Sequence, residues 1–185
     1  MPGRHIPDPD VRMLAAIAAT LRGDYIREGR ADPWAGSPFA WIRTLPSRQR
    51  GKIGEQLVAG WCAAKGLDVT ASPDSEADRV IAGRRVEVKF STVWASGVYK
   101  FQQIRDHRYD YAICLGLAPF DAGCWLISKG LLRKYVIGHT PQHAGRRGTD
   151  TFWLSFPAGD PPEWLSTCGG TLARVYELLR AAGPP

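Results

Sequence analysis

The spacing of hydrophobic residues predicts several helices along the chain. Residues 53–65 place Ile53, Leu57 and Trp61 on one side, and Gly66 follows as a natural end of that helix. Four other segments show a comparable spacing of apolar residues, or a short apolar run that ends at polar residues. The segments predicted to be helical are residues 11–28, 53–65, 101–108, 129–136 and 171–182.

Alternating or continuous apolar runs predict strands between these helices. Residues 151–156 alternate around Phe152, Leu154 and Phe156, and residues 85–90 follow residues 78–81 through a glycine-containing turn, as in a β-hairpin. Strands and helices interleave, so the fold class is α/β, with a mixed central β-sheet flanked by helices. The predicted strands are residues 67–71, 78–81, 85–90, 109–117, 124–127 and 151–156.

Proline and glycine divide the chain into two parts. The stretch 29–38 is rich in both residues and is typical of a connection. We therefore interpret residues 1–46 as an N-terminal helical arm or subdomain and residues 47–185 as the main domain.

Composition narrows the class of protein. The chain has 185 residues, 44% hydrophobic and 23% charged, as expected for a globular domain, and a net charge of +6 that favours a polyanion such as DNA as partner. Its four cysteines include no C-x-x-C pair, so neither a zinc site nor a disulfide framework is expected. We find no signal-like apolar region and no apolar run long enough to span a bilayer, and expect a cytoplasmic protein without a membrane partner.

One predicted strand combines apolar residues with two opposite charges. Because side chains alternate along a strand, Glu87 and Lys89 point to one face and Val86, Val88 and Phe90 to the other. The apolar three can bury in a core, which leaves a carboxylate and an ammonium together on the opposite face. A Glu-x-Lys tripeptide alone is also compatible with an ordinary surface salt bridge.

The preceding strand adds a second carboxylate. If the turn is tight, Asp78 lies across the hairpin from Lys89 and close to Glu87. Paired carboxylates are hard oxygen ligands for Mg²⁺, and a lysine beside the metal can orient a water or stabilise developing negative charge. This combination supports hydrolysis of a phosphodiester.

The order of these residues resembles the PD-(D/E)XK nuclease superfamily, over roughly residues 50–128. The resemblance rests on Glu55 in a helix, then Asp78, then Glu87-Val-Lys89, then Gln102-Gln103 opening a helix. It implies a restriction-endonuclease-like core. It also implies that Asp78 and Glu87 bind Mg²⁺ (with Mn²⁺ expected to substitute), that the Val88 carbonyl completes the metal site, and that Lys89 serves the attacking water.

The resemblance assigns supporting roles to other residues. Glu55 would contact the metal through water, and Gln102 or Gln103 would lie near the scissile phosphate. Each assignment has an alternative: Glu55 is an exposed helix residue, the glutamines cap a helix, and Asp74, which follows Pro73, replaces Asp78 as the metal ligand. We prefer Asp78 because it lies within the predicted hairpin.

Basic and aromatic residues around this constellation are candidates for binding nucleic acid. Phosphate contacts need only a density of cations. Trp94 and Tyr99 lie just beyond the predicted strand that carries Glu87 and Lys89, and they are candidates for stacking on an unpaired base. The candidate DNA contacts are Arg48, Arg50, Lys52, Lys100, Gln102, Arg105, Arg146 and Arg147.

These residues together indicate an expected function. The sequence predicts a Mg²⁺-dependent DNA endonuclease of restriction or modification-directed type, with Asp78, Glu87, Lys89, Glu55 and Gln103 as its catalytic residues. A structure-selective nuclease like a Holliday-junction resolvase and a non-catalytic DNA-binding domain are the alternatives. The family resemblance also implies a homodimer, because cutting both strands commonly uses two copies of one active site.

Overall fold

The computed structural model describes residues 13, 15–17, 32–141 and 150–182. The chain divides into two compact units, Met1–Ala35 and Gly36–Pro185. Most of the first unit lies outside the described residues, so the helix predicted over residues 11–28 and the arm predicted over residues 1–46 stay predictions. The short helix α2 (Ala40–Arg43) belongs to the second unit, which also contains the predicted hairpin.

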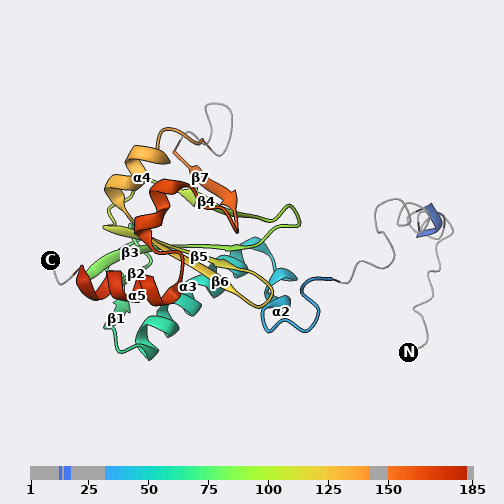
Figure 1. Ribbon diagram of the computed structural model, residues 1–185, viewed down its shortest axis with the longest axis horizontal. Helices are drawn as coiled ribbons and strands as arrows, with labels where there is room; N and C mark the ends of the chain where they lie inside the picture. The colour runs from blue at the N-terminus through green and yellow to red at the C-terminus, as the bar shows by residue number, and fades with distance from the viewer. Residues whose placement is uncertain (1–12, 14, 18–31, 142–149, 183–185) are drawn as a thin grey trace. The chain divides into compact units, whose positions relative to one another are not determined.

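A five-stranded sheet forms the centre of the second unit (Figure 1). Its strands lie in the order β1-β2-β3-β5-β6. Only the β3–β5 pair is parallel, and the other three pairs are antiparallel, so the sheet is mixed as predicted. The strands are β1 (Val69–Ala71), β2 (Arg79–Ile81), β3 (Arg84–Thr92), β5 (Tyr111–Leu117) and β6 (Ala122–Ser128).

Among the described residues, a smaller sheet and four helical segments besides α2 complete this unit. The small sheet pairs β4 (Val98–Ile104) with β7 (Phe152–Pro157) in antiparallel orientation. The predicted α/β class is confirmed, since helices flank a mixed sheet. The helical segments are α3 (Ser47–Ala64), α4 (Lys129–Tyr135), the 3₁₀ helix η1 (Glu163–Cys168) and α5 (Leu172–Ala181).

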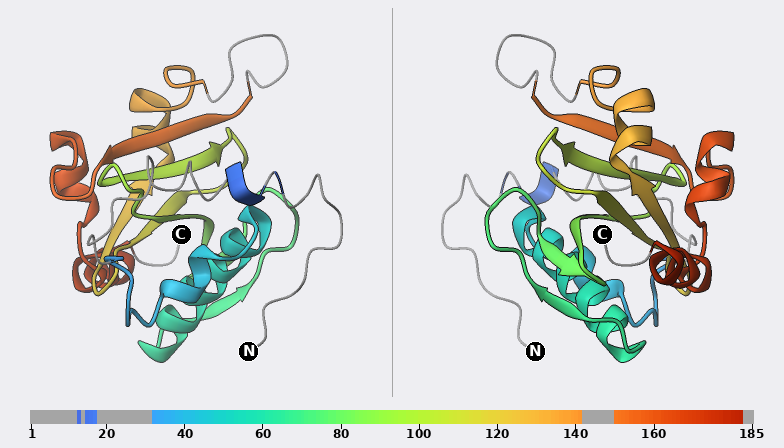
Figure 2. Two further views of the ribbon diagram at one scale, coloured as in Figure 1. Left: turned by 90° about the vertical axis from the view of Figure 1, so that its right-hand side faces the viewer. Right: turned by 90° about the vertical axis from the view of Figure 1, so that its left-hand side faces the viewer.

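The two faces of the large sheet are covered differently. Helix α3 packs on β3, where Gly54 lies so close to Phe90 that an added Cβ would come within 2.3 Å of the Phe90 Cβ atom. On the opposite face, Trp125 of β6 packs against Tyr99, Phe101 and Phe156 of the small sheet in T-shaped ring contacts. Figure 2 shows α3 and the small sheet on opposite sides of the large sheet. The large sheet is therefore held between a helix and an aromatic core.

One predicted helix is wrong. Residues 101–104 belong to strand β4, and residues 105–108 connect it to β5. Alternating Tyr99 and Phe101 are buried against the large sheet, which fixes the extended conformation by tertiary packing. The helix predicted over residues 53–65 begins earlier, at Ser47 directly after Pro46, so the basic run before Ile53 is itself helical. The short helices α2 and η1 were not predicted.

The remaining elements lie within a few residues of the ranges predicted from the sequence. The hairpin β2–β3, the strands β5, β6 and β7, and the helices α4 and α5 all lie where predicted. No helix among the described residues is long and apolar enough to cross a membrane.

Candidate active site

A tight hairpin turn fixes the geometry of the candidate site. Ala82 and Gly83 form a two-residue turn in which both φ angles are positive, 50° and 77°. Arg79 pairs with Val86 across the hairpin. Asp78 directly precedes this pair, and its hydrogen bonds go to Val86 and Val88, which corrects the prediction that Asp78 lies directly across from Lys89.

Asp78 is anchored at its backbone and at its side chain. Its N–H donates to the Val86 carbonyl at 3.0 Å, and its Oδ2 accepts a hydrogen bond from the Val88 N–H at 2.7 Å. The carboxylate thus extends the hairpin beyond the last paired residue of β2. This leaves its other oxygen for a further partner.

Glu87 and Lys89 form a close, largely buried ion pair. The Lys89 Nζ lies 2.7 Å from the Glu87 Oε1, with side-chain exposures of 14% and 11%. Both residues pair with β5 on the face that carries Ala112 and Cys114, as the predicted alternation requires. A solvated surface salt bridge is therefore not the arrangement adopted here.

Glu55 joins the two carboxylates from helix α3. Burial and the Asp78 carboxylate raise the pKa of Glu55, while Arg79, at 3.9 Å, and Lys52 act in the opposite direction. Burial also raises the pKa of Glu87, which Lys89 counteracts and Asp78 reinforces. Three carboxylates thus interact in a partly dehydrated site, where further positive charge would be stabilising.

These groups line a cleft of about 820 Å³ between the N-terminal turns of α3 and strands β3 and β4. The cleft brings together every predicted catalytic, metal-binding and phosphate-contacting residue that lies within the described part of the chain. Arg146 and Arg147 lie outside the described residues. The predicted residues on the cleft wall are Arg48, Arg50, Lys52, Glu55, Asp78, Glu87, Val88, Lys89, Lys100, Gln102, Gln103 and Arg105.

The two glutamines reach the cleft through a β-bulge. Phe101 pairs with Leu154 and Ile104 with Phe152, so two residues of β4 face one residue of β7. Gln103 adopts a left-handed backbone conformation with φ of 56°. Phe101 and Ile104 are fully buried while Gln102 and Gln103 are both exposed, so the bulge turns two consecutive polar side chains toward the cleft.

The alternative acidic residue, Asp74, is engaged elsewhere. Its carboxylate forms a two-pronged ion pair with the Arg85 guanidinium, which lowers its pKa, and it does not line the cleft. The geometry favours Asp78. Of the two aromatic candidates, Tyr99 is wrong because it is buried in the core at 3% exposure, whereas Trp94 lines the cleft at 49% exposure.

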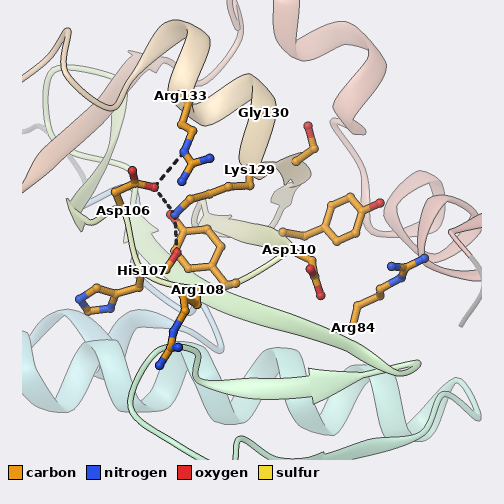
Figure 3. Close-up of a pocket in the computed structure, with 11 residues that line it drawn as sticks. Arg84, Asp106, His107, Arg108, Asp110, Lys129, Gly130 and Arg133 are labelled. Carbon is orange, nitrogen blue, oxygen red and sulfur yellow. Dashed lines mark hydrogen bonds and ion pairs between the residues drawn. The ribbon is translucent and has the colours of Figure 1, made fainter. Parts of the chain in front are cut away.

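Sequence reasoning missed His107. It lines the cleft and lies near enough to Glu87 to lower the pKa of that carboxyl. It also lines a second hollow of about 450 Å³ (Figure 3), where Lys129 lies beside Asp106. No local motif marked His107, since it follows a strand whose sequence favours a helix.

The four cysteines are all buried thiols. Burial raises the pKa of Cys62 and of Cys114 to about 12, so both stay protonated at neutral pH. Within the described residues, no group of three or more His, Cys, Asp or Glu side chains is placed to hold a metal ion by itself.

The chain matches no protein-family model and no curated protein. Among solved structures, it is similar to a bacterial homing endonuclease, with 16% sequence identity, a TM-score of 0.49, and coverage of 75% of this chain and 94% of that chain. A likeness of this size says nothing of activity, so function has to be inferred from the site.

Proposed function

We propose that this protein is a Mg²⁺-dependent DNA endonuclease of the PD-(D/E)XK type. The observation that carries the proposal is the Glu87–Lys89 ion pair, buried on the wall of a cleft that also holds Asp78 and Glu55. Burying charges is costly unless they are paired, and folding alone would be served as well by apolar residues at these positions. A carboxylate and a lysine retained there are typical of a catalytic site.

The donor set fits a magnesium ion. Mg²⁺ is usually bound through one or two carboxylates, together with waters and substrate phosphate, so a cluster of three carboxylates is not required. The Val88 N–H points to Asp78, and the N–H and C=O of one strand residue point to the same side, so the Val88 carbonyl faces the Asp78 side too. Asp78, Glu87 and the Val88 carbonyl would hold the ion, with Glu55 acting through water.

The bound metal would supply a water of lowered pKa and positive charge at the scissile phosphate. Lys89 would orient that water through its ammonium and stabilise the negative charge that develops on the phosphate. Its ion pair with Glu87 fixes the ammonium before substrate arrives, which limits the reorganisation needed during the reaction.

The cation-rich wall of the cleft supports a polyanionic substrate. Arg48, Arg50 and Lys52 lie on the first turns of α3, and Lys100 and Arg105 on or just after β4. The Arg50 Nε is buried and has no hydrogen-bond partner among the described residues. A movement of this side chain toward a bound phosphate would satisfy that donor, since an unpaired buried donor costs about 1–3 kcal/mol.

Plasmid cleavage with a substitution at Lys89 tests this function. The parent, Lys89→Met and Lys134→Ala, a control at an exposed lysine on α4, are compared in Mg²⁺, Ca²⁺ and EDTA on unmodified, methylated and branched DNA. We expect Mg²⁺-dependent cutting that Lys89→Met lowers by a factor on the order of a hundred or more, with DNA binding retained. Preference within the DNA panel separates restriction-type, modification-directed and structure-selective cleavage. Mg²⁺-dependent cutting by Lys89→Met at the parent rate contradicts the assignment.

The result can also favour a non-catalytic DNA-binding domain. Binding without cutting in the parent, on every DNA and with Mn²⁺ replacing Mg²⁺, would assign the cleft to recognition alone. Circular dichroism and thermal unfolding of each variant show whether a loss of cutting reflects a loss of fold.

A further inference from the structure

An exposed tryptophan follows strand β3. Trp94 begins the turn between β3 and β4, and its side chain is 49% exposed. A single exposed aromatic residue is common on protein surfaces and needs no explanation by itself. Trp94 differs because it lines the same cleft as Glu87 and Lys89.

Hydrogen bonds fix the backbone of Trp94, and a cation contacts its indole ring. The backbone N–H of Trp94 donates to the Val98 carbonyl at 2.9 Å, and the backbone N–H of Gly97 donates to the Trp94 carbonyl at 2.8 Å. The Lys100 Nζ lies 4.1 Å from the centroid of the Trp94 ring, within the range of a cation–π interaction. These contacts limit the conformational freedom that the ring would lose on binding a ligand.

Lys100 is itself positioned from two sides. Its backbone N–H donates to the Ser91 Oγ at 3.0 Å, which connects β4 to the end of strand β3. Its ammonium also lies 5.8 Å from the centroid of Trp153 on β7. A positive charge between two indole rings therefore faces the cleft, beside Gln102 of the β-bulge.

We infer that Trp94 and Lys100 form a binding site for an unpaired nucleotide. The indole face stacks on the base, and the Lys100 ammonium meets the adjoining phosphate. In fully paired DNA the base faces are covered by their neighbours, whereas an unpaired base offers a face to an aromatic ring. This inference rests on the proposed function and specifies its substrate as DNA with an unpaired nucleotide close to the scissile phosphate.

An exposed aromatic ring also occurs at protein–protein interfaces, but the surroundings here are those of a polyanion site. The same cleft carries Arg48, Arg50 and Lys52 in addition to Lys100. Stacking combined with a cationic groove is the usual way in which proteins hold unpaired nucleic acid.

Binding to two matched DNA duplexes tests the inference. Both duplexes contain one fluorescent adenine analogue, either paired or unpaired in a single-nucleotide bulge. Titrations in Ca²⁺ and in EDTA, without Mg²⁺, separate binding from cutting. The proteins are the parent, Trp94→Ala, Trp94→Phe, which keeps an aromatic ring, and Trp41→Ala, which removes a tryptophan that is 55% exposed and outside the cleft.

We expect Trp94→Ala to lower affinity for the bulged duplex about tenfold, since stacking on an aromatic ring contributes substantially to the binding of an unpaired base. Affinity for the paired duplex should not change. Trp94→Phe should keep most of the affinity, Trp41→Ala should keep all of it, and only proteins with an aromatic residue at position 94 should alter the emission of the unpaired analogue. Equal losses on both duplexes, or no loss on either, overturn the inference.

Adding Mg²⁺ to the same complexes distinguishes this inference from the proposed function. Trp94-dependent binding of the bulge without cutting means that the site exists and the nuclease assignment fails. Cutting that is the same in the parent and in Trp94→Ala on every DNA means that the nuclease assignment stands and the nucleotide site fails. A parent protein that binds neither duplex contradicts both.

Discussion

The Oδ2 atom of Asp78 accepts a 2.7 Å hydrogen bond from the Val88 N–H, so one carboxylate oxygen holds the hairpin together while the other stays available to a ligand. Substitutions at Asp78 can therefore separate the effect of its negative charge from the effect of its hydrogen bond with Val88. Asp78→Asn keeps an oxygen that accepts the Val88 hydrogen bond but removes the negative charge. Asp78→Ala removes both.

We therefore expect Asp78→Asn to unfold close to the parent in urea but to cut DNA on the order of a hundredfold more slowly. Asp78→Ala should lose the same activity and about 1–3 kcal/mol of stability in addition, because the Val88 N–H is left without its acceptor. If Asp78→Asn cuts at the parent rate, Asp78 has a structural role alone.

Glu55 is predicted to reduce the stability of the free protein at neutral pH. Its pKa is raised in the folded state by burial and by Asp78. A raised carboxyl pKa means that the stability contributed by this group is complete below the unfolded-state pKa and is lost as pH rises through the folded-state pKa. Removing the charge should therefore stabilise the protein above that range.

Glu55→Gln should accordingly unfold at a higher temperature than the parent at pH 7–8, with a difference that shrinks toward pH 4 (for a domain of this size, 1 kcal/mol is about 2–4 °C). Thermal unfolding in EDTA across this pH range measures the effect. A constant difference at all pH values would mean that the ionisation of Glu55 is not its cause. If Glu55 serves the metal site, the same substitution also weakens cutting.

The hairpin and the charged pair were predictable because their signals are local. Glu87 and Lys89 alternate with Val86 and Val88, and a period of two is visible in six residues. The position of Asp78 relative to Glu87 and Lys89 depends on a turn of two residues rather than three. That one-residue change in register could not be derived from glycine content alone.

The bulge in β4 was not predictable from the sequence. Gln102 and Gln103 are consecutive polar residues, a pattern that disfavours a regular strand and favours the start of a helix. Their conformation is set by pairing with β7, whose residues are some fifty positions away in the chain. The prediction that both glutamines belong near the site came from the family resemblance, and they do reach the cleft, but from a different element.

Substitutions at two glycines of α3 can test how closely this helix packs on strand β3, which carries Glu87 and Lys89. At Gly54, an added Cβ would come within 2.3 Å of the Phe90 Cβ, an atom fixed to the backbone of β3. At Gly60, an added Cβ would meet no atom within 4 Å apart from its chain neighbours and the backbone of the helix itself, and the residue is exposed. The intrinsic helix preference for alanine is the same at both positions.

Gly60→Ala should stabilise the protein by about 0.5–1 kcal/mol through helix propensity. Gly54→Ala should instead destabilise it by about 1–3 kcal/mol through overpacking, and it should lower DNA cutting because Phe90 directly follows Lys89. Urea unfolding and plasmid cleavage of both variants measure these effects. Stabilisation by both substitutions would mean that α3 and β3 are less closely packed than the short approach of Gly54 to Phe90 implies.

Lys129 is predicted to position His107 and Arg105 in the cleft without entering it. The Lys129 Nζ lies 2.6 Å from the His107 carbonyl and 2.8 Å from the Asp106 Oδ1, and 3.8 Å from the centroid of Tyr109 (Figure 3). These contacts hold the connection from β4 to β5 through a residue that does not line the cleft. Burial lowers the pKa of Lys129, which Asp106 partly offsets.

Lys129→Met keeps much of the side-chain volume but removes these charged contacts, at a cost of about 1.5–3 kcal/mol for a hydrogen bond to a charged group. Arg133→Ala is the control, because Arg133 also contacts Asp106, is 62% exposed, and should change stability by no more than about 0.5 kcal/mol. If Lys129 positions the connection, Lys129→Met loses cutting at temperatures where it is fully folded, and the loss appears in kcat more than in DNA affinity, because the phosphate contacts on α3 remain. Unchanged kcat in a folded but less stable Lys129→Met would reduce its role to stability alone.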